Sequence, residues 1–105
     1  MEIRLLIVEI NNMQLIGYHA TNKKNAKSIL KNGFEPIKYA YQHPNPKIKE
    51  LIWTWFTYDQ QFEYGRVCIK VDLTDLDCAV NDLCIICKED YISKDRILDV
   101  VYETK

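Results

Sequence analysis

The sequence predicts an α+β domain in which several short strands pack with one main helix. Apolar alternation and β-branched or aromatic content recur in short segments, which is typical of strands. One segment near the N-terminus has apolar residues at helical spacing and ends at a glycine. The 105 residues, 48% of them hydrophobic and 28% charged, suffice for one core. We therefore expect a single domain over residues 1–105.

Two strands are predicted first. Glu2 to Asn11 is rich in Ile, Leu and Val, and its apolar run indicates burial on both faces. A turn at Asn11-Asn12 leads into the second strand, Met13 to Ala20. The two strands could pair as a hairpin or lie apart in the sheet, and the pattern leaves both arrangements open.

A helix is predicted over Asn22 to Asn32, where three apolar residues share one face. The Thr21 hydroxyl is expected to cap its first turn by accepting from a backbone N–H. Gly33 stands where a left-handed residue commonly ends a helix. The segment Glu35 to Leu51 then contains all three prolines and is predicted to be irregular. It is either a lid or binding loop, or a plain surface connection.

Aromatic and β-branched residues predict a strand over Leu51 to Phe56. Thr57 is expected to cap a short helix, Tyr58 to Tyr64, which Gly65 ends. Arg66 to Leu73 alternates as a strand should.

The last third of the chain begins with a predicted polar connection, Thr74 to Asp82. Strands are expected over Leu83 to Lys88 and over Ile97 to Tyr102, with a turn from Ser93 through Arg96 between them.

Charge and cysteine content narrow the class of protein. The net charge of −1 provides no strong field for nucleic acid or anionic lipid. Neither a signal peptide nor a membrane span is recognisable, so a cytoplasmic location with no membrane partner is expected. Cys84 and Cys87 would point to opposite faces of one strand, which disfavours a shared metal. We expect the cysteines to be core residues and no metal site, with zinc or a disulfide as the alternatives.

The first candidate site is the exit of the second strand. His19 and Thr21 are two residues apart, so on a strand both lean to the same side, where they could hold a ligand. The alternative is that His19 is an ordinary surface or half-buried histidine beside a helix cap.

The run YHATNKKNAKSILKNGF, residues 18–34, resembles the opening motif of the ADP-ribosyltransferase fold. The similarity is to the histidine-bearing branch, which includes the poly(ADP-ribose) polymerases and small bacterial and phage proteins. The resemblance implies a split β-sheet of two facing half-sheets with one main helix and short connecting helices. It also implies that His19, Ala20 and Thr21 bind NAD, with His19 orienting a ribose.

A second motif of that family is matched by IWTWFTYDQQFEYG, residues 52–65. The resemblance implies that Trp53 lies against the nicotinamide riboside and that Tyr64 stacks on the nicotinamide ring. Trp53 departs from the tyrosine of the polymerases. Without the resemblance, Trp53 and Tyr64 would be interpreted as core aromatics between strand and helix.

The third motif is a catalytic carboxylate immediately before a strand, a position that falls on Asp82. The family has glutamate there, and aspartate is about 1.5 Å shorter in reach. A displacement of about 1 Å can cost roughly a hundredfold in rate. The carboxylate would stabilise positive charge on C1′ as nicotinamide leaves.

The resemblance therefore implies a transferase, with Asp82 and His19 in catalytic roles. It would move ADP-ribose from NAD, its substrate, to an unknown protein, nucleic-acid or small-molecule acceptor. Two other interpretations stay open. One is an inactive member of the family that serves as a ligand-binding or protein-interaction module. The other is a small structural or inhibitor domain of phage or mobile-element type.

Overall fold

The computed structural model describes residues 14–36 and 53–104. Within these ranges the elements follow the order β1, α2, β2, β3, β4, β5, the short 3-10 helix η2 (Lys94–Arg96) and β6. The strand predicted over Glu2 to Asn11 and its following turn lie outside the described residues. So does nearly all of the segment Glu35 to Leu51, including its interpretation as a lid.

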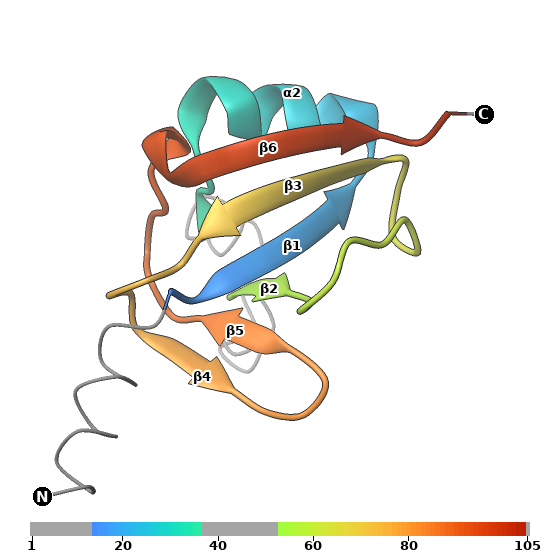
Figure 1. The fold of residues 1–105 in the computed structure, drawn as a ribbon. Coiled ribbons are helices and arrows are strands. Elements are labelled where there is room, and N and C mark those ends of the chain that lie inside the picture. The colour runs from blue at the N-terminus through green and yellow to red at the C-terminus, as the bar shows by residue number, and fades with distance from the viewer. Residues whose placement is uncertain (1–13, 37–52, 105) are drawn as a thin grey trace, which may run out of the picture.

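The first sheet has three antiparallel strands in the order β1-β3-β6. They are β1 (Ile16–Thr21), β3 (Val67–Asp72) and β6 (Ile97–Tyr102). The predictions of these three strands are confirmed, β6 to the residue. Figure 1 shows β3 between its two neighbours. This central position explains why four of its six side chains are buried.

The second sheet is also antiparallel, in the order β2-β5-β4. Its strands are short: β2 (Thr54–Phe56), β4 (Cys78–Val80) and β5 (Ile85–Cys87). β4 lies within residues 74–82, so the prediction of a polar connection there is wrong. A three-residue edge strand depends on pairing with its neighbour more than on its own sequence, which gives the pattern little to detect.

Helix α2 (Lys23–Asn32) covers one face of the first sheet, as Figure 1 shows. Its N-cap is Asn22, whose side chain accepts from the Asn25 N–H at 2.7 Å. The prediction that Thr21 caps the helix is therefore wrong. Thr21 is the last residue of β1, is buried, and is paired with Val67.

Gly33 ends α2 with a positive φ of 81°, as predicted, but its ψ of −171° is extended rather than left-handed helical. The chain therefore leaves the helix straight into an extended conformation. Phe34 then exchanges two backbone hydrogen bonds with Ile92, at 2.9 and 3.0 Å. Both residues of this bridge are buried and belong to the core.

The helix predicted over Tyr58 to Tyr64 is absent, and these residues form bends and a turn. Thr57 makes an isolated bridge to Tyr18 instead of capping a helix, through backbone hydrogen bonds of 2.9 and 2.8 Å. The Tyr58 hydroxyl donates to the Asn81 carbonyl oxygen across the fold. These tertiary contacts fix a non-helical path that local propensity did not reveal.

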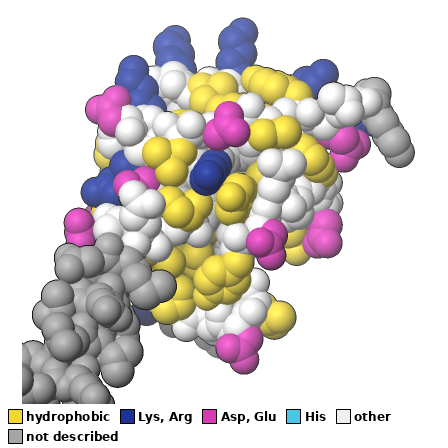
Figure 2. Space-filling view, viewed as in Figure 1, with side chains coloured by type: hydrophobic (Ala, Val, Ile, Leu, Met, Phe, Trp, Pro, Cys, Tyr) yellow, Lys and Arg dark blue, Asp and Glu magenta, His cyan; other side chains and the backbone are white. Residues whose placement is uncertain are grey.

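Both sheets contribute to one core, which confirms the α+β class in its coarse form: two three-stranded antiparallel sheets and one helix. The sheets approach closely at Gly17, where an added Cβ would lie 2.7 Å from side-chain atoms of Leu73 and Phe56. Figure 2 shows Lys and Arg side chains along the upper edge, where Figure 1 places α2, and hydrophobic atoms over the sheets below. The largest fully buried side chains are Phe56, Ile69, Leu73, Ile85 and Ile92.

Candidate functional site

The site is organised around His19, which β1 carries opposite Ile69 of β3. Its imidazole packs edge-on against Phe34, with ring centroids 5.3 Å apart, and lies 5.6 Å from the Phe56 ring. The His19 Nδ1 atom is 2.8 Å from the Trp55 carbonyl oxygen. A carbonyl oxygen can only accept, so Nδ1 carries the hydrogen and Nε2 is the basic nitrogen of the neutral ring.

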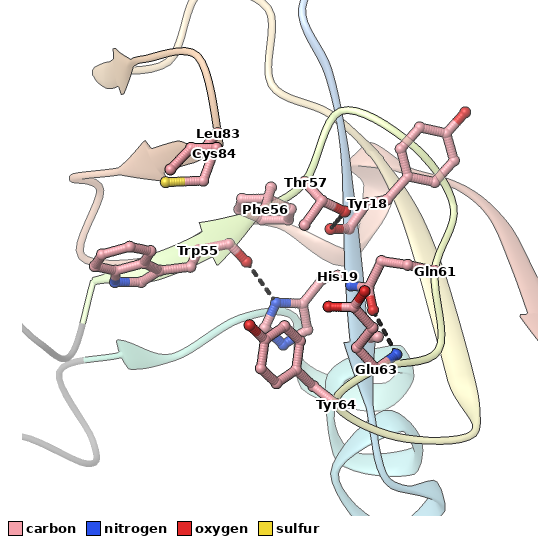
Figure 3. A pocket seen from close by; sticks show the side chains of 11 residues that line it. Tyr18, His19, Trp55, Phe56, Thr57, Gln61, Glu63, Tyr64, Leu83 and Cys84 are labelled. Atoms are coloured by element: carbon pink, nitrogen blue, oxygen red, sulfur yellow. Dashed lines mark hydrogen bonds between the residues drawn. The ribbon is translucent and has the colours of Figure 1, made fainter.

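The surroundings of His19 favour this neutral ring. Burial lowers the pKa of His19 below its ordinary value of 6.5, and the hydrogen bond to the Trp55 carbonyl opposes that shift only in part. At neutral pH the imidazole is therefore uncharged, with Nδ1–H used internally and Nε2 able to accept a hydrogen bond. Figure 3 shows Nε2 on the side of the ring facing away from Trp55.

A pocket of about 580 Å³ opens beside this ring. Its volume falls within the roughly 300–1,000 Å³ of ordinary small-molecule sites. The walls come from β1 on one sheet, and from β2 and the residue after it on the other, so the pocket lies where the two sheets meet. These wall residues are Tyr18, His19, Ala20, Trp55, Phe56 and Thr57.

The rim of the pocket comes from two loops. One is the segment after β2, and the other is the turn between β4 and β5. Figure 3 shows both rims, with the His19 imidazole between Trp55 and the segment that carries Tyr64. The rim residues are Gln61, Glu63, Tyr64, Leu83 and Cys84.

Three of the site residues predicted from sequence line this pocket: His19, Ala20 and Tyr64. Tyr64 is 74% exposed, so its ring has a face free to receive a flat ligand. It reaches the pocket from a turn rather than from a helix. Thr21 is buried at the end of β1 and is not among the lining residues.

Trp53 and Asp82 also lie outside the lining. Trp53 precedes β2, and the tryptophan at the pocket is Trp55, which is 45% exposed. Asp82 is exposed in the β4–β5 turn, one residue before the lining residue Leu83. The resemblance pointed to Trp53 alone, and strand periodicity does not distinguish it from Trp55, two residues further along the chain.

The lining carboxylate is Glu63, which the sequence analysis did not select. Its backbone N–H donates to the Gln61 side-chain oxygen at 2.7 Å, and this bond shapes the turn that carries Tyr64. The only feature of the sequence that could have pointed to Glu63 is its position next to Tyr64. A helix over this segment would have placed the two side chains about 100° apart, which concealed their shared pocket.

The opposite rim is shaped by Asn81. Its side-chain oxygen accepts from the backbone N–H groups of Leu83 and Cys84, at 2.8 and 2.9 Å. The Tyr58 hydroxyl donates to the Asn81 backbone carbonyl and so links this turn to the segment after β2. The two rims of the pocket are therefore connected to each other.

Comparison with known proteins adds no further assignment: no family model, curated protein or solved structure matches the chain. Among the described residues, no helix has the length and apolar character needed to cross a membrane. In the same part of the chain, no three His, Cys, Asp or Glu side chains are grouped so that they could hold a metal ion.

Proposed function

We propose that this protein is a small ADP-ribosyltransferase-like protein that binds NAD in the pocket between its two sheets. The observation that carries the proposal is His19, a neutral imidazole at a pocket whose volume suits a small-molecule ligand. Its Nδ1–H is occupied by the Trp55 carbonyl, which fixes the orientation of the ring. Its location near the end of β1, ahead of helix α2, agrees with the resemblance of residues 18–34 to the family's opening motif.

The chemistry of the pocket suits a ribose bearing an aromatic base. The neutral Nε2 accepts from a ribose hydroxyl, which is a donor of the right kind. Trp55 and Tyr64 offer partly exposed rings against which nicotinamide or adenine can stack. The described lining contains no Lys or Arg, so it suits the nucleoside part of NAD better than its pyrophosphate.

Transfer of ADP-ribose also needs a carboxylate near C1′, where positive charge develops as the bond to nicotinamide breaks. In the proposal, Asp82 supplies this charge from the β4–β5 turn. The position of Asp82 outside the described lining favours a second candidate, an inactive member of the fold that binds its ligand without turnover. The acceptor in the first case is a protein, a nucleic acid or a small molecule.

Titration of the full chain with NAD, followed by Trp fluorescence and calorimetry, tests the proposal. A parallel incubation measures released nicotinamide. His19→Gln removes the ring nitrogen that accepts the hydrogen bond. We expect this variant to bind NAD about tenfold more weakly or worse, because the loss of one hydrogen bond costs about 1.5 kcal/mol. Lys27→Gln, on the exposed side of α2, is the matched control and should bind as the wild type does.

The outcomes separate the candidates. Nicotinamide release that disappears in Asp82→Ala supports a transferase. Saturable binding without release supports the binding module. Absence of NAD binding to the folded wild-type chain would refute both.

A further inference from the structure

Two cysteines face each other across the second sheet. Cys78 of β4 and Cys87 of β5 are direct partners in the antiparallel register. Neither takes part in the pocket lining, and all four described cysteines are free thiols. The pair is therefore separate from the site proposed above.

The hydrogen-bond pattern of the β4–β5 hairpin shows which kind of pair this is. Asn81 donates its N–H to the Cys84 carbonyl at 3.1 Å, and Lys88 donates its N–H to the Asp77 carbonyl at 2.7 Å. Hydrogen-bonded and non-hydrogen-bonded pairs alternate along an antiparallel ladder. Counting inward from either end makes the 79–86 pair hydrogen-bonded and the 78–87 pair non-hydrogen-bonded.

A non-hydrogen-bonded pair brings its Cα atoms to about 4.5 Å and its side chains close together. Disulfides span Cα separations of about 4.4–6.8 Å, so this pair lies within the range without movement of the backbone. Cys78 and Cys87 also interact through their side chains. The other two pairs of this ladder, 79–86 and 80–85, hold no cysteine.

Burial distinguishes the two thiols. Cys87 belongs to the core, between Thr54 of β2 and Cys78, whereas Cys78 is half-buried on the edge strand. Burial is the main reason why the pKa of Cys78 is raised to about 12, and the neighbouring Cys87, Asp77 and Glu89 raise it further. Both thiols are therefore protonated at neutral pH and react slowly.

We propose that Cys78 and Cys87 are a cross-strand dithiol that a small-molecule disulfide oxidises to an intramolecular disulfide joining β4 to β5. One protein thiolate attacks the external disulfide and releases one small thiol. The other protein thiolate then attacks the mixed disulfide and releases the second. Two electrons pass from the protein sulfurs to the reagent, whose two sulfurs leave with the two protons. The bond would close the hairpin that carries Leu83 and Cys84 to the pocket rim.

To test the proposal, the protein is treated with oxidised glutathione, and peptide mapping then identifies which cysteines have become linked. A protease that cleaves before aspartate separates Cys78, in residues 77–81, from Cys87, in residues 82–89. Cys84 shares the second peptide, so the work is done in a Cys84→Ser background, where any link between these peptides is Cys78–Cys87. Oxidation at roughly pH 9 raises the thiolate fraction, and free thiols are then alkylated.

We expect the linked peptide to become the main form and to separate again on reduction. Cys78→Ala in the same background removes the link, while Cys68→Ala, in β3, leaves it unchanged. Circular dichroism checks that each variant is folded. Free thiols at both positions, a glutathione adduct that never resolves, or links found only between chains would each overturn the proposal.

Discussion

Replacement of Gly33 by alanine tests whether the backbone conformation and the close contacts at the end of α2 require a glycine. The backbone there, with φ 81° and ψ −171°, lies in a region that is essentially confined to glycine, at a cost of about 1–3 kcal/mol for other residues. A Cβ atom would also collide with the Ile92 carbonyl oxygen and lie 2.9 Å from the Tyr91 hydroxyl oxygen. Such overpacking typically costs about 1–3 kcal/mol.

The two effects together predict that Gly33→Ala lowers the free energy of unfolding by about 2–6 kcal/mol. That is a large share of the roughly 5–15 kcal/mol available to a small domain. The loss should be measurable by urea denaturation, followed by Trp fluorescence and far-UV circular dichroism. Phe34 would move with the backbone, so the environment of the His19 ring should change as well.

Asn32→Ala is the matched control, because Asn32 is exposed and immediately precedes the glycine. It should change the free energy of unfolding by less than about 1 kcal/mol. If Gly33→Ala were no less stable than this control, the argument from backbone conformation and close contact would be refuted.

Three further predictions concern titration, the core and the thiols. The His19 ring should titrate with a pKa below 6.5 by NMR. The free energy of unfolding should then fall as the pH drops below 6.5, because the unfolded chain binds the proton first. A pKa at or above 6.5 would contradict the burial of the ring. Phe56→Ala should cost about 3–5 kcal/mol in a denaturant titration, since the ring is fully buried and packs on Phe34 and His19; a loss under about 1 kcal/mol would exclude that packing. Oxidation of Cys78 should accelerate about tenfold per pH unit between roughly pH 7 and 9, as its thiolate fraction rises, and a rate independent of pH would contradict its raised pKa.

The elements that the sequence predicted best are those whose own residues determine them. β3 and β6 have strand periodicity and composition over six residues each, and α2 has an apolar stripe closed by Gly33. The start of α2 was misplaced because Thr21 and Asn22 are both good caps. Thr21 ends β1 by pairing with Val67 of β3, and this pairing left the cap to Asn22.

The features that were missed depend on contacts between distant residues. β4 exists because it pairs with β5, and its polar flanks conceal it. The segment after β2 does not form a helix because two long-range contacts fix its path. These are the backbone hydrogen bonds between Thr57 and Tyr18, and the hydrogen bond from the Tyr58 hydroxyl to the Asn81 carbonyl oxygen.

The same reason limits what could be predicted of the site. Sequence reasoning placed His19, Ala20 and Tyr64 at one site, and they line one pocket. It took Trp53 from the family resemblance, whereas the tryptophan within β2 is Trp55. Glu63 was overlooked because its segment was expected to be helical. The roles of these residues in binding NAD stay predictions until the titration is done.

The isolated bridge between Tyr18 and Thr57 has a mechanical consequence. Within the described residues it is the one backbone bridge between the two sheets, and the His19–Trp55 hydrogen bond adds a side-chain link beside it. A small rotation about this pair would widen or narrow the space beside His19 while both sheets keep their ladders, and it would strain the His19–Trp55 hydrogen bond. A guest molecule touching both walls would oppose that rotation, so occupancy should stiffen the joint and slow hydrogen exchange at the two bridging amides.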